Sequence, residues 1–201
     1  MNLSAAELVK RSAAQLWFFT NHPERRKKNE TFQKIAGQKF AKQNTKSKYI
    51  EMGNYYLYNG HRIYFAIDEV NKEKGKMHLI EHKMVKNFDE CPPWYFQNSL
   101  IQVAFYGALT NRQTKLRSAK FTGQSYEIRT QSRMYSKLNF GGKWYTVTYD
   151  AEPVMDFFMK KIRALESYKQ AKAFDTLYKH REWEEHFKKY IRYRKVNRKH
   201  E

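Results

Sequence analysis

The chain has 201 residues, and its 39 lysine and arginine residues outnumber 20 acidic residues, which gives a formal net charge of +19. A hydrophobic content of 41% and an aromatic content of 16% exclude an intrinsically disordered protein, because such chains lack the apolar residues for a core. No run of about 18 apolar residues is present, so we expect no membrane span. The N-terminal segment lacks a continuous apolar region, so we expect no signal peptide.

The single cysteine, Cys91, excludes an internal disulfide and any multi-cysteine zinc or iron–sulfur site within this chain. We therefore expect a reducing, cytoplasmic setting. The positive charge attracts polyanions, of which nucleic acid is the commonest inside cells. The same charge also suits a protein that binds acidic lipid or an acidic partner.

Helices are predicted in the first part of the chain. Ser4 and Glu7 have the spacing of a capping box, in which each side chain satisfies a free backbone N–H of the first turn. The segment 21–23 contains a proline and ends this helix. Apolar residues at helical spacing predict a second helix over 31–42.

Stretches rich in aromatic and branched residues predict the strands. The strands cover 49–58, 61–70 and 76–85, and later 126–130, 133–140 and 143–149. Asn59 and Gly60 join the first two, because both residue types tolerate the positive φ of a tight hairpin. The first three strands are therefore predicted to form an antiparallel meander. Gly141 and Gly142 predict a second hairpin.

A helix is predicted over 94–109, where Pro93 suits the first turn, followed by a polar, basic connector over 110–123. From Pro153 the pattern is helical nearly to the C-terminus. This element order predicts an α+β or α/β fold in which helices flank a mixed β-sheet. We expect a single domain over residues 1–201. Its core covers about residues 1–150, and a C-terminal helical segment covers about residues 151–201.

The stretch 188–195 interleaves basic and aromatic residues. Bases stack on aromatic rings while lysine and arginine contact phosphates, so this stretch can bind a single strand of nucleic acid. The alternative is an amphipathic helix with Tyr190 and Ile191 packed and the cations in solvent. The basic stretches 25–28 and 112–117 leave the same two interpretations open.

The stretch 66–83 carries the residues with the clearest chemistry. If its hairpin centres near Lys74 and Gly75, Asp68 lies opposite Glu81, and directly opposed side chains are about 4.5–5.5 Å apart at Cβ. Alternation along a strand places Glu81 and Lys83 on one face and His82 on the other.

Two carboxylates, with the main-chain carbonyl of His82, form a ligand set that suits Mg²⁺ or Mn²⁺. Such a cation lowers the pKa of a bound water and neutralises charge on a scissile phosphate, and Lys83 would orient or deprotonate that water. The competing interpretation is a surface ion pair of Glu81 with Lys83, a common and weak interaction. Apolar neighbours such as Ile67 and Leu79 favour the metal, because carboxylates among apolar residues are costly unless paired.

Asp68, the run Ile80-Glu81-His82-Lys83 and the run Gln102-Val-Ala-Phe-Tyr106 occur in this order. The array resembles the PD-(D/E)XK nuclease superfamily, in its RecB-like branch, over about residues 1–110. The resemblance implies a restriction-endonuclease-like core and a metal-dependent deoxyribonuclease, exonuclease or endonuclease, in DNA recombination, repair or end processing, often in phage. It also implies that Gln102 and Tyr106, four residues apart on one helix face, lie beside the metal and the nucleic-acid backbone. The catalytic residues implied are Asp68, Glu81, Lys83, Gln102 and Tyr106.

The chain departs from this family in its early helix, where members often place a histidine ligand and this sequence has none between 22 and 61. Gln38, Glu30 and Glu51 are the available substitutes. Glu69 is a further carboxylate, but alternation directs it to the face opposite Asp68.

Three functions follow from these observations. The first is a nuclease that acts on single-stranded DNA or duplex ends. The second is a non-catalytic nucleic-acid-binding protein derived from a nuclease fold. The third is a basic scaffold for a protein partner. Assembly into a homo-oligomer stays open.

Overall fold

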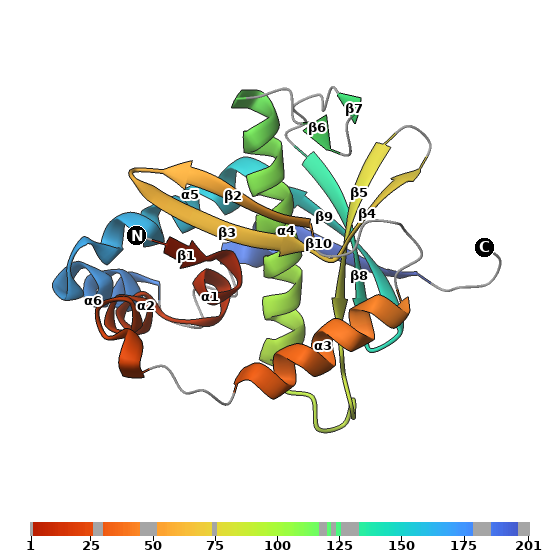
Figure 1. Ribbon diagram of the computed structural model, residues 1–201, viewed down its shortest axis with the longest axis horizontal. Coiled ribbons are helices and arrows are strands. Elements are labelled where there is room, and N and C mark those ends of the chain that lie inside the picture. Colours follow the sequence, from red (N-terminus) through yellow and green to blue (C-terminus); the bar gives the residue numbers. More distant parts are fainter. Residues whose placement is uncertain are drawn as a thin grey trace.

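The computed structural model describes residues 2–25, 30–44, 52–73, 76–116, 120–121, 124–125, 133–178 and 186–196 (Figure 1). The helices are α1 (Ala5–Lys10), α2 (Ala13–Asn21), α3 (Glu30–Asn44), α4 (Pro93–Leu116), α5 (Ala151–Arg163) and α6 (Tyr168–Leu177), with 3-10 turns at Pro23–Arg25 and Ala164–Glu166. The strands are β1 (Asn2–Ser4), β2 (Met52–Tyr58), β3 (His61–Ile67), β4 (Glu69–Glu73), β5 (Lys76–Lys83), β6 (Lys120–Phe121), β7 (Gln124–Ser125), β8 (Arg133–Phe140), β9 (Lys143–Asp150) and β10 (Ile191–Val196).

The strands form two mixed sheets in the described part of the chain, besides the short β6–β7 pair. One sheet has the order β1-β3-β2, and the other has the order β10-β9-β8-β5-β4. The β1–β3 and β5–β8 pairs are parallel, and the other pairs in these two sheets are antiparallel. Since parallel neighbours need a crossover connection, α4 runs between β5 and β8 and contacts strands of both sheets (Figure 1). The predicted mixed α+β architecture is confirmed.

Both predicted hairpin turns are present. Asn59 and Gly60 have φ values of 45° and 72°, and Gly141 and Gly142 have values of 58° and 87°. Glycine reaches this region without strain, which fixes the registers of the β2–β3 and β8–β9 hairpins.

The predicted antiparallel meander over 49–85 is wrong in one respect. The strand predicted over 61–70 bends at Asp68, so β3 and β4 belong to different sheets and β3 does not pair with β5. The reason is a side chain that replaces a ladder bond: Oδ2 of Asp68 accepts a hydrogen bond of 2.7 Å from the backbone N–H of His82. The β4–β5 register, with Glu69 opposite Ile80, still centres on 74–75 as predicted.

The C-terminal segment is also not helical throughout. Ile191–Val196 forms strand β10, which pairs with β9 along its whole length. The amphipathic helix that was one alternative for residues 188–195 therefore holds only for 188–190, because pairing with β9, a strand distant in sequence, satisfies the backbone groups of 191–196.

One helix boundary and one helix cap differ from the prediction. Helix α4 continues to Leu116, beyond the predicted end at 109. Ser4 makes no capping hydrogen bond through its side chain. The capping box is instead at Ser12 and Gln15, whose side chains each bond the other residue's backbone N–H at 3.2 Å. The strand predicted over 126–130 lies outside the described residues.

One cluster of buried apolar residues runs from Leu3 to Ile191, and α4 lies at its centre. Gly107 permits this position, since a Cβ there would overlap the hydroxyl of the buried Tyr149 and lie 2.7 Å from its Cζ. Among the described helices, none has the length and apolar character needed to cross a bilayer.

Candidate active site

Glu81 is the most buried ionisable group of the candidate site, with 3% of its surface exposed. It lies on β5, which pairs with β4 along one edge and with β8 along the other. Helix α4 packs against β5 and β8. Oε1 of Glu81 accepts hydrogen bonds from Nζ of Lys83 at 2.5 Å and from Nε2 of Gln102 at 2.8 Å. Its Oε2 is buried and has no hydrogen-bond partner among the described residues.

Asp68 lies in the bend between β3 and β4, one step beyond the pair of Glu69 with Ile80. Its bond to the N–H of His82 holds its carboxylate at the edge of β5, within electrostatic range of Glu81. In a strand, the N–H and C=O of one residue point to the same edge, so the carbonyl of His82 is directed toward Asp68 as well. The bend therefore brings together the three predicted metal ligands.

Lys83 follows Glu81 on the same face of β5, as alternation predicts. Burial alone would lower the pKa of Lys83, but the carboxylates of Glu81 and Asp68 outweigh burial and raise it. Lys83 is therefore a cation at neutral pH. Its ammonium suits the orientation of a water or a phosphate oxygen, and not the removal of a proton.

Gln102 and Tyr106 project from one face of α4 toward Glu81. Nε2 of Gln102 donates both to Oε1 of Glu81 and, at 2.9 Å, to the hydroxyl of Tyr106. Burial raises the pKa of Tyr106 well above its ordinary value, so this phenol stays protonated. The structure thus joins four of the predicted residues, Glu81, Lys83, Gln102 and Tyr106, in one hydrogen-bonded chain.

The electrostatics of Glu81 fit a bound cation. Burial raises the pKa of Glu81 to about 7, Lys83 opposes this rise and Asp68 adds to it. A buried carboxylate oxygen without a donor costs free energy that a cation would recover. Hard oxygen atoms from Glu81, Asp68 and the His82 carbonyl suit Mg²⁺ or Mn²⁺.

The third side-chain ligand expected of the resembled family does not emerge. In the part of the chain that the structure describes, no group of three or more His, Cys, Asp or Glu side chains could hold a metal. Of the proposed substitutes, Gln38 is half-buried on α3, which packs against β5. The side chains of Glu30 and Glu51 lie outside the described part.

The opposite face of β5 carries a second polar group that the sequence did not single out. The ring of His82 is buried. Its Nδ1 is 3.0 Å from Nδ2 of Asn139, and its Nε2 is 3.4 Å from Oε2 of Glu69. Burial lowers the pKa of His82, so the ring is neutral near pH 7. Glu69 therefore faces away from Glu81, as predicted, and belongs to this separate group. The partner Asn139 could not be found from sequence, since it comes from β8.

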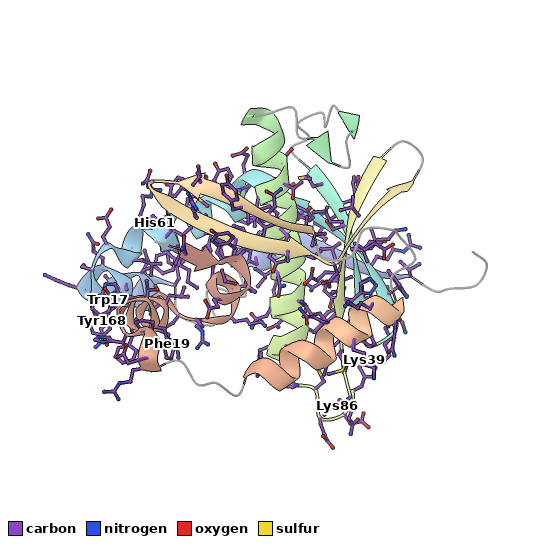
Figure 2. The ribbon with its side chains drawn as sticks, viewed as in Figure 1. Trp17, Phe19, Lys39, His61, Lys86 and Tyr168 are labelled. Atoms are coloured by element: carbon purple, nitrogen blue, oxygen red, sulfur yellow. The ribbon has the colours of Figure 1, made fainter. Side chains whose placement is uncertain are left out.

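Exposed cations lie on elements that adjoin the candidate site. Lys10 of α1 acts electrostatically on Glu81. Figure 2 shows Lys39 on α3 and Lys86 beyond the end of β5 toward the same end of the molecule, and both are exposed. These cations would attract an anionic substrate to the acidic pair.

No family model matches this chain, and no curated protein or solved structure matches it either.

Proposed function

We propose that this protein is a metal-dependent deoxyribonuclease that hydrolyses phosphodiester bonds, in DNA recombination, repair or end processing. The observation that carries the proposal is Oε2 of Glu81, a buried carboxylate oxygen to which no described residue donates, beside a second carboxylate and a lysine. Asp68, Glu81 and the main-chain carbonyl of His82 would hold Mg²⁺ or Mn²⁺. The bound cation would supply a water of lowered pKa and would neutralise charge on the phosphate.

The other residues act on this centre through the contacts described above. Lys83, as a cation, orients the attacking water or a phosphate oxygen. Gln102 fixes the rotamer of Glu81 by its bond to Oε1, which leaves Oε2 for the ligand. Tyr106 accepts from Gln102 and holds the amide in that orientation. Gln102 and Tyr106 therefore position the carboxylate from α4.

DNA is the proposed substrate because the chain carries a formal charge of +19, and such a charge binds a phosphate backbone with release of counterions. Two carboxylates beside a lysine repel a phosphate group unless a cation neutralises them. Cleavage therefore depends on the metal, whereas binding of DNA rests on the charge of the rest of the chain and does not.

The test is a cleavage assay on linear duplex, circular duplex and single-stranded DNA, with Mg²⁺, Mn²⁺ or a chelator. We expect wild-type cleavage only with metal, and its loss in Glu81→Ala and Lys83→Ala. Binding of DNA in chelator should change little in either variant, because nearly all of the positive charge remains. Lys169→Ala, which removes an exposed cation of α6, is the matched control and should cleave normally. Equal cleavage by wild type and both site variants would refute the assignment.

The second candidate function is a non-catalytic nucleic-acid-binding protein with a nuclease-derived fold. It is favoured by the number of ligands, since the described residues add no third metal-ligating side chain to the two carboxylates. This function predicts salt-sensitive DNA binding without turnover under any of the metal conditions.

A further inference from the structure

The three strands β8, β9 and β10 carry a face that is separate from the candidate active site. The registers align their residues in rows across the sheet: Tyr135, Thr148 and Arg192 in the first row, Lys137, Thr146 and Arg194 in the second, and Asn139, Trp144 and Val196 in the third. Successive rows are about 6.8 Å apart, since each step covers two residues. We name these nine residues the open face.

Ring contacts assign the two sides of this sheet. Tyr193 of β10 packs against Tyr145 of β9 and Phe96 of α4, with ring centroids 6.0 and 5.2 Å away, so it lies on the α4 side. Its neighbours Arg192 and Arg194 therefore point to the other side. Trp144 meets the ring of His82 edge to face at 5.8 Å, which places Trp144 on that other side as well.

The open face is solvent-accessible away from β5. On the same side of β5, Ile80 and His82 are buried, whereas Tyr135 on β8 is 42% exposed. Arg192 and Arg194 are exposed, and Lys137, Trp144 and the two threonines are half-buried.

The open face joins three cations, two aromatic rings and two threonine hydroxyls from segments up to 59 residues apart in sequence. The described side chains on this side of β8, β9 and β10 include one carboxylate, Asp150, at the end of β9. Cations on one face with aromatic rings are the composition that binds single-stranded nucleic acid, since bases stack on the rings and phosphates contact the cations.

We propose that the open face binds single-stranded DNA. Stacking on Tyr135 and Trp144 requires unpaired bases, because the bases of a duplex stack on one another. A face of three strands is also wider than a two-stranded ribbon, the widest sheet element that enters a major groove. Charge complementarity identifies the ligand as a polyanion, and the choice of DNA over RNA rests on the proposed function.

The test measures binding of fluorescein-labelled dT15 by anisotropy in chelator, so that no cleavage is required. Arg192→Ala with Arg194→Ala should reduce the slope of log affinity against log salt by about 1.4, at 0.7 for each phosphate contact. The matched control is Arg163→Ala with Lys169→Ala, which removes two exposed cations from α5 and α6. This control should leave the slope within about 0.3 of the wild-type value.

The aromatic contribution is tested with a pair of variants at one position. Tyr135→Ala should weaken dT15 binding about tenfold, and Tyr135→Phe, which keeps the ring, should bind within about twofold of wild type. Trp144 provides a second readout, since dT15 should quench tryptophan fluorescence in wild type and quench it less in Trp144→Phe. Thermal unfolding of each variant checks that the fold is retained.

Three results would overturn the proposal: equal salt slopes for the arginine pair and its control, equal binding by Tyr135→Ala and Tyr135→Phe, or tighter binding of a duplex or of U15 than of dT15. Each of these is independent of cleavage. A failure of the open face therefore leaves the nuclease proposal standing, and absence of metal-dependent cleavage leaves the binding result standing.

Discussion

Replacing Glu81 with glutamine should make the protein more stable at pH 8 in the absence of metal. Burial raises the pKa of Glu81 from 4.5 to about 7, so the folded state disfavours the carboxylate. Between these two pH values the folded state binds a proton that the unfolded state has lost, so the free energy of unfolding falls as pH rises from 4.5 to 7. It then stays low above pH 7.

The magnitude follows from the two pKa values. At about 1.4 kcal/mol for each pH unit between them, the full loss is about 3 kcal/mol, of which about 2.5 kcal/mol falls between pH 5 and pH 8. Glutamine cannot ionise and has the same shape, so the Glu81→Gln variant avoids this loss. The attraction between Lys83 and the Glu81 carboxylate is already part of the pKa of about 7, so its loss in the variant adds no slope of its own.

The assay is urea unfolding of wild type and Glu81→Gln from pH 5 to pH 8 in chelator. As pH rises from 5 to 8, the free energy of unfolding of wild type should fall by about 2.5 kcal/mol relative to that of the variant. Asp156→Asn, which neutralises an exposed carboxylate on α5, should follow the wild-type profile. Parallel profiles for wild type and Glu81→Gln would refute the electrostatic account of the site.

Metal addition completes this experiment. A ligand that binds only the folded state stabilises it by mass action, by about 2.7 kcal/mol at 100 times its dissociation constant. Mn²⁺ should therefore raise the stability of wild type at pH 8 and leave Glu81→Gln nearly unchanged. Stabilisation of both proteins to the same extent would place the cation elsewhere.

Two further predictions concern the scaffold. Gly107→Ala should lower the free energy of unfolding by about 2 kcal/mol, because the new methyl overlaps Tyr149. Gly37→Ala on α3 should raise it by up to about 1 kcal/mol, because no atom lies within 4 Å of the new Cβ. Urea unfolding measures both. Burial lowers the pKa of Lys161 to about 7, so the unfolded state holds the extra proton above pH 7. The stability contributed by Lys161 should therefore rise by about 2 kcal/mol from pH 7 to pH 9. Lys161→Met should remove this rise and also leave two main-chain carbonyls of the α1 region without their donor, with lower stability at pH 9. An unchanged pH profile in that variant would contradict the assignment of the shift to Lys161.

Local patterns in the sequence were sufficient for several elements. Asn59-Gly60 and Gly141-Gly142 predicted two hairpins because the ability to adopt a positive φ is a property of these residue types. The centre of the β4–β5 hairpin and the four-residue spacing of Gln102 and Tyr106 were predictable for the same reason, since each depends on one element or one turn. These local facts placed Glu81 with Lys83 and Gln102 with Tyr106, whereas the expectation that the two pairs lie together came from the resemblance to the nuclease superfamily.

Tertiary structure decided the features that depend on contacts between distant segments. The bend at Asp68 divides one predicted strand between two sheets, because a side chain bonds the N–H of His82 where a ladder bond would have continued. The segment 191–196 became a strand because β9 offered an unpaired edge. Alternation within a single strand predicts which residues share a face. It does not predict which strand lies beside them or how far Glu81 is removed from water. The sequence by itself therefore determined which residues of one element can act together. Only the packing of β5 with α4 and β8 determined that Glu81 is buried, with an Oε2 that no described residue bonds.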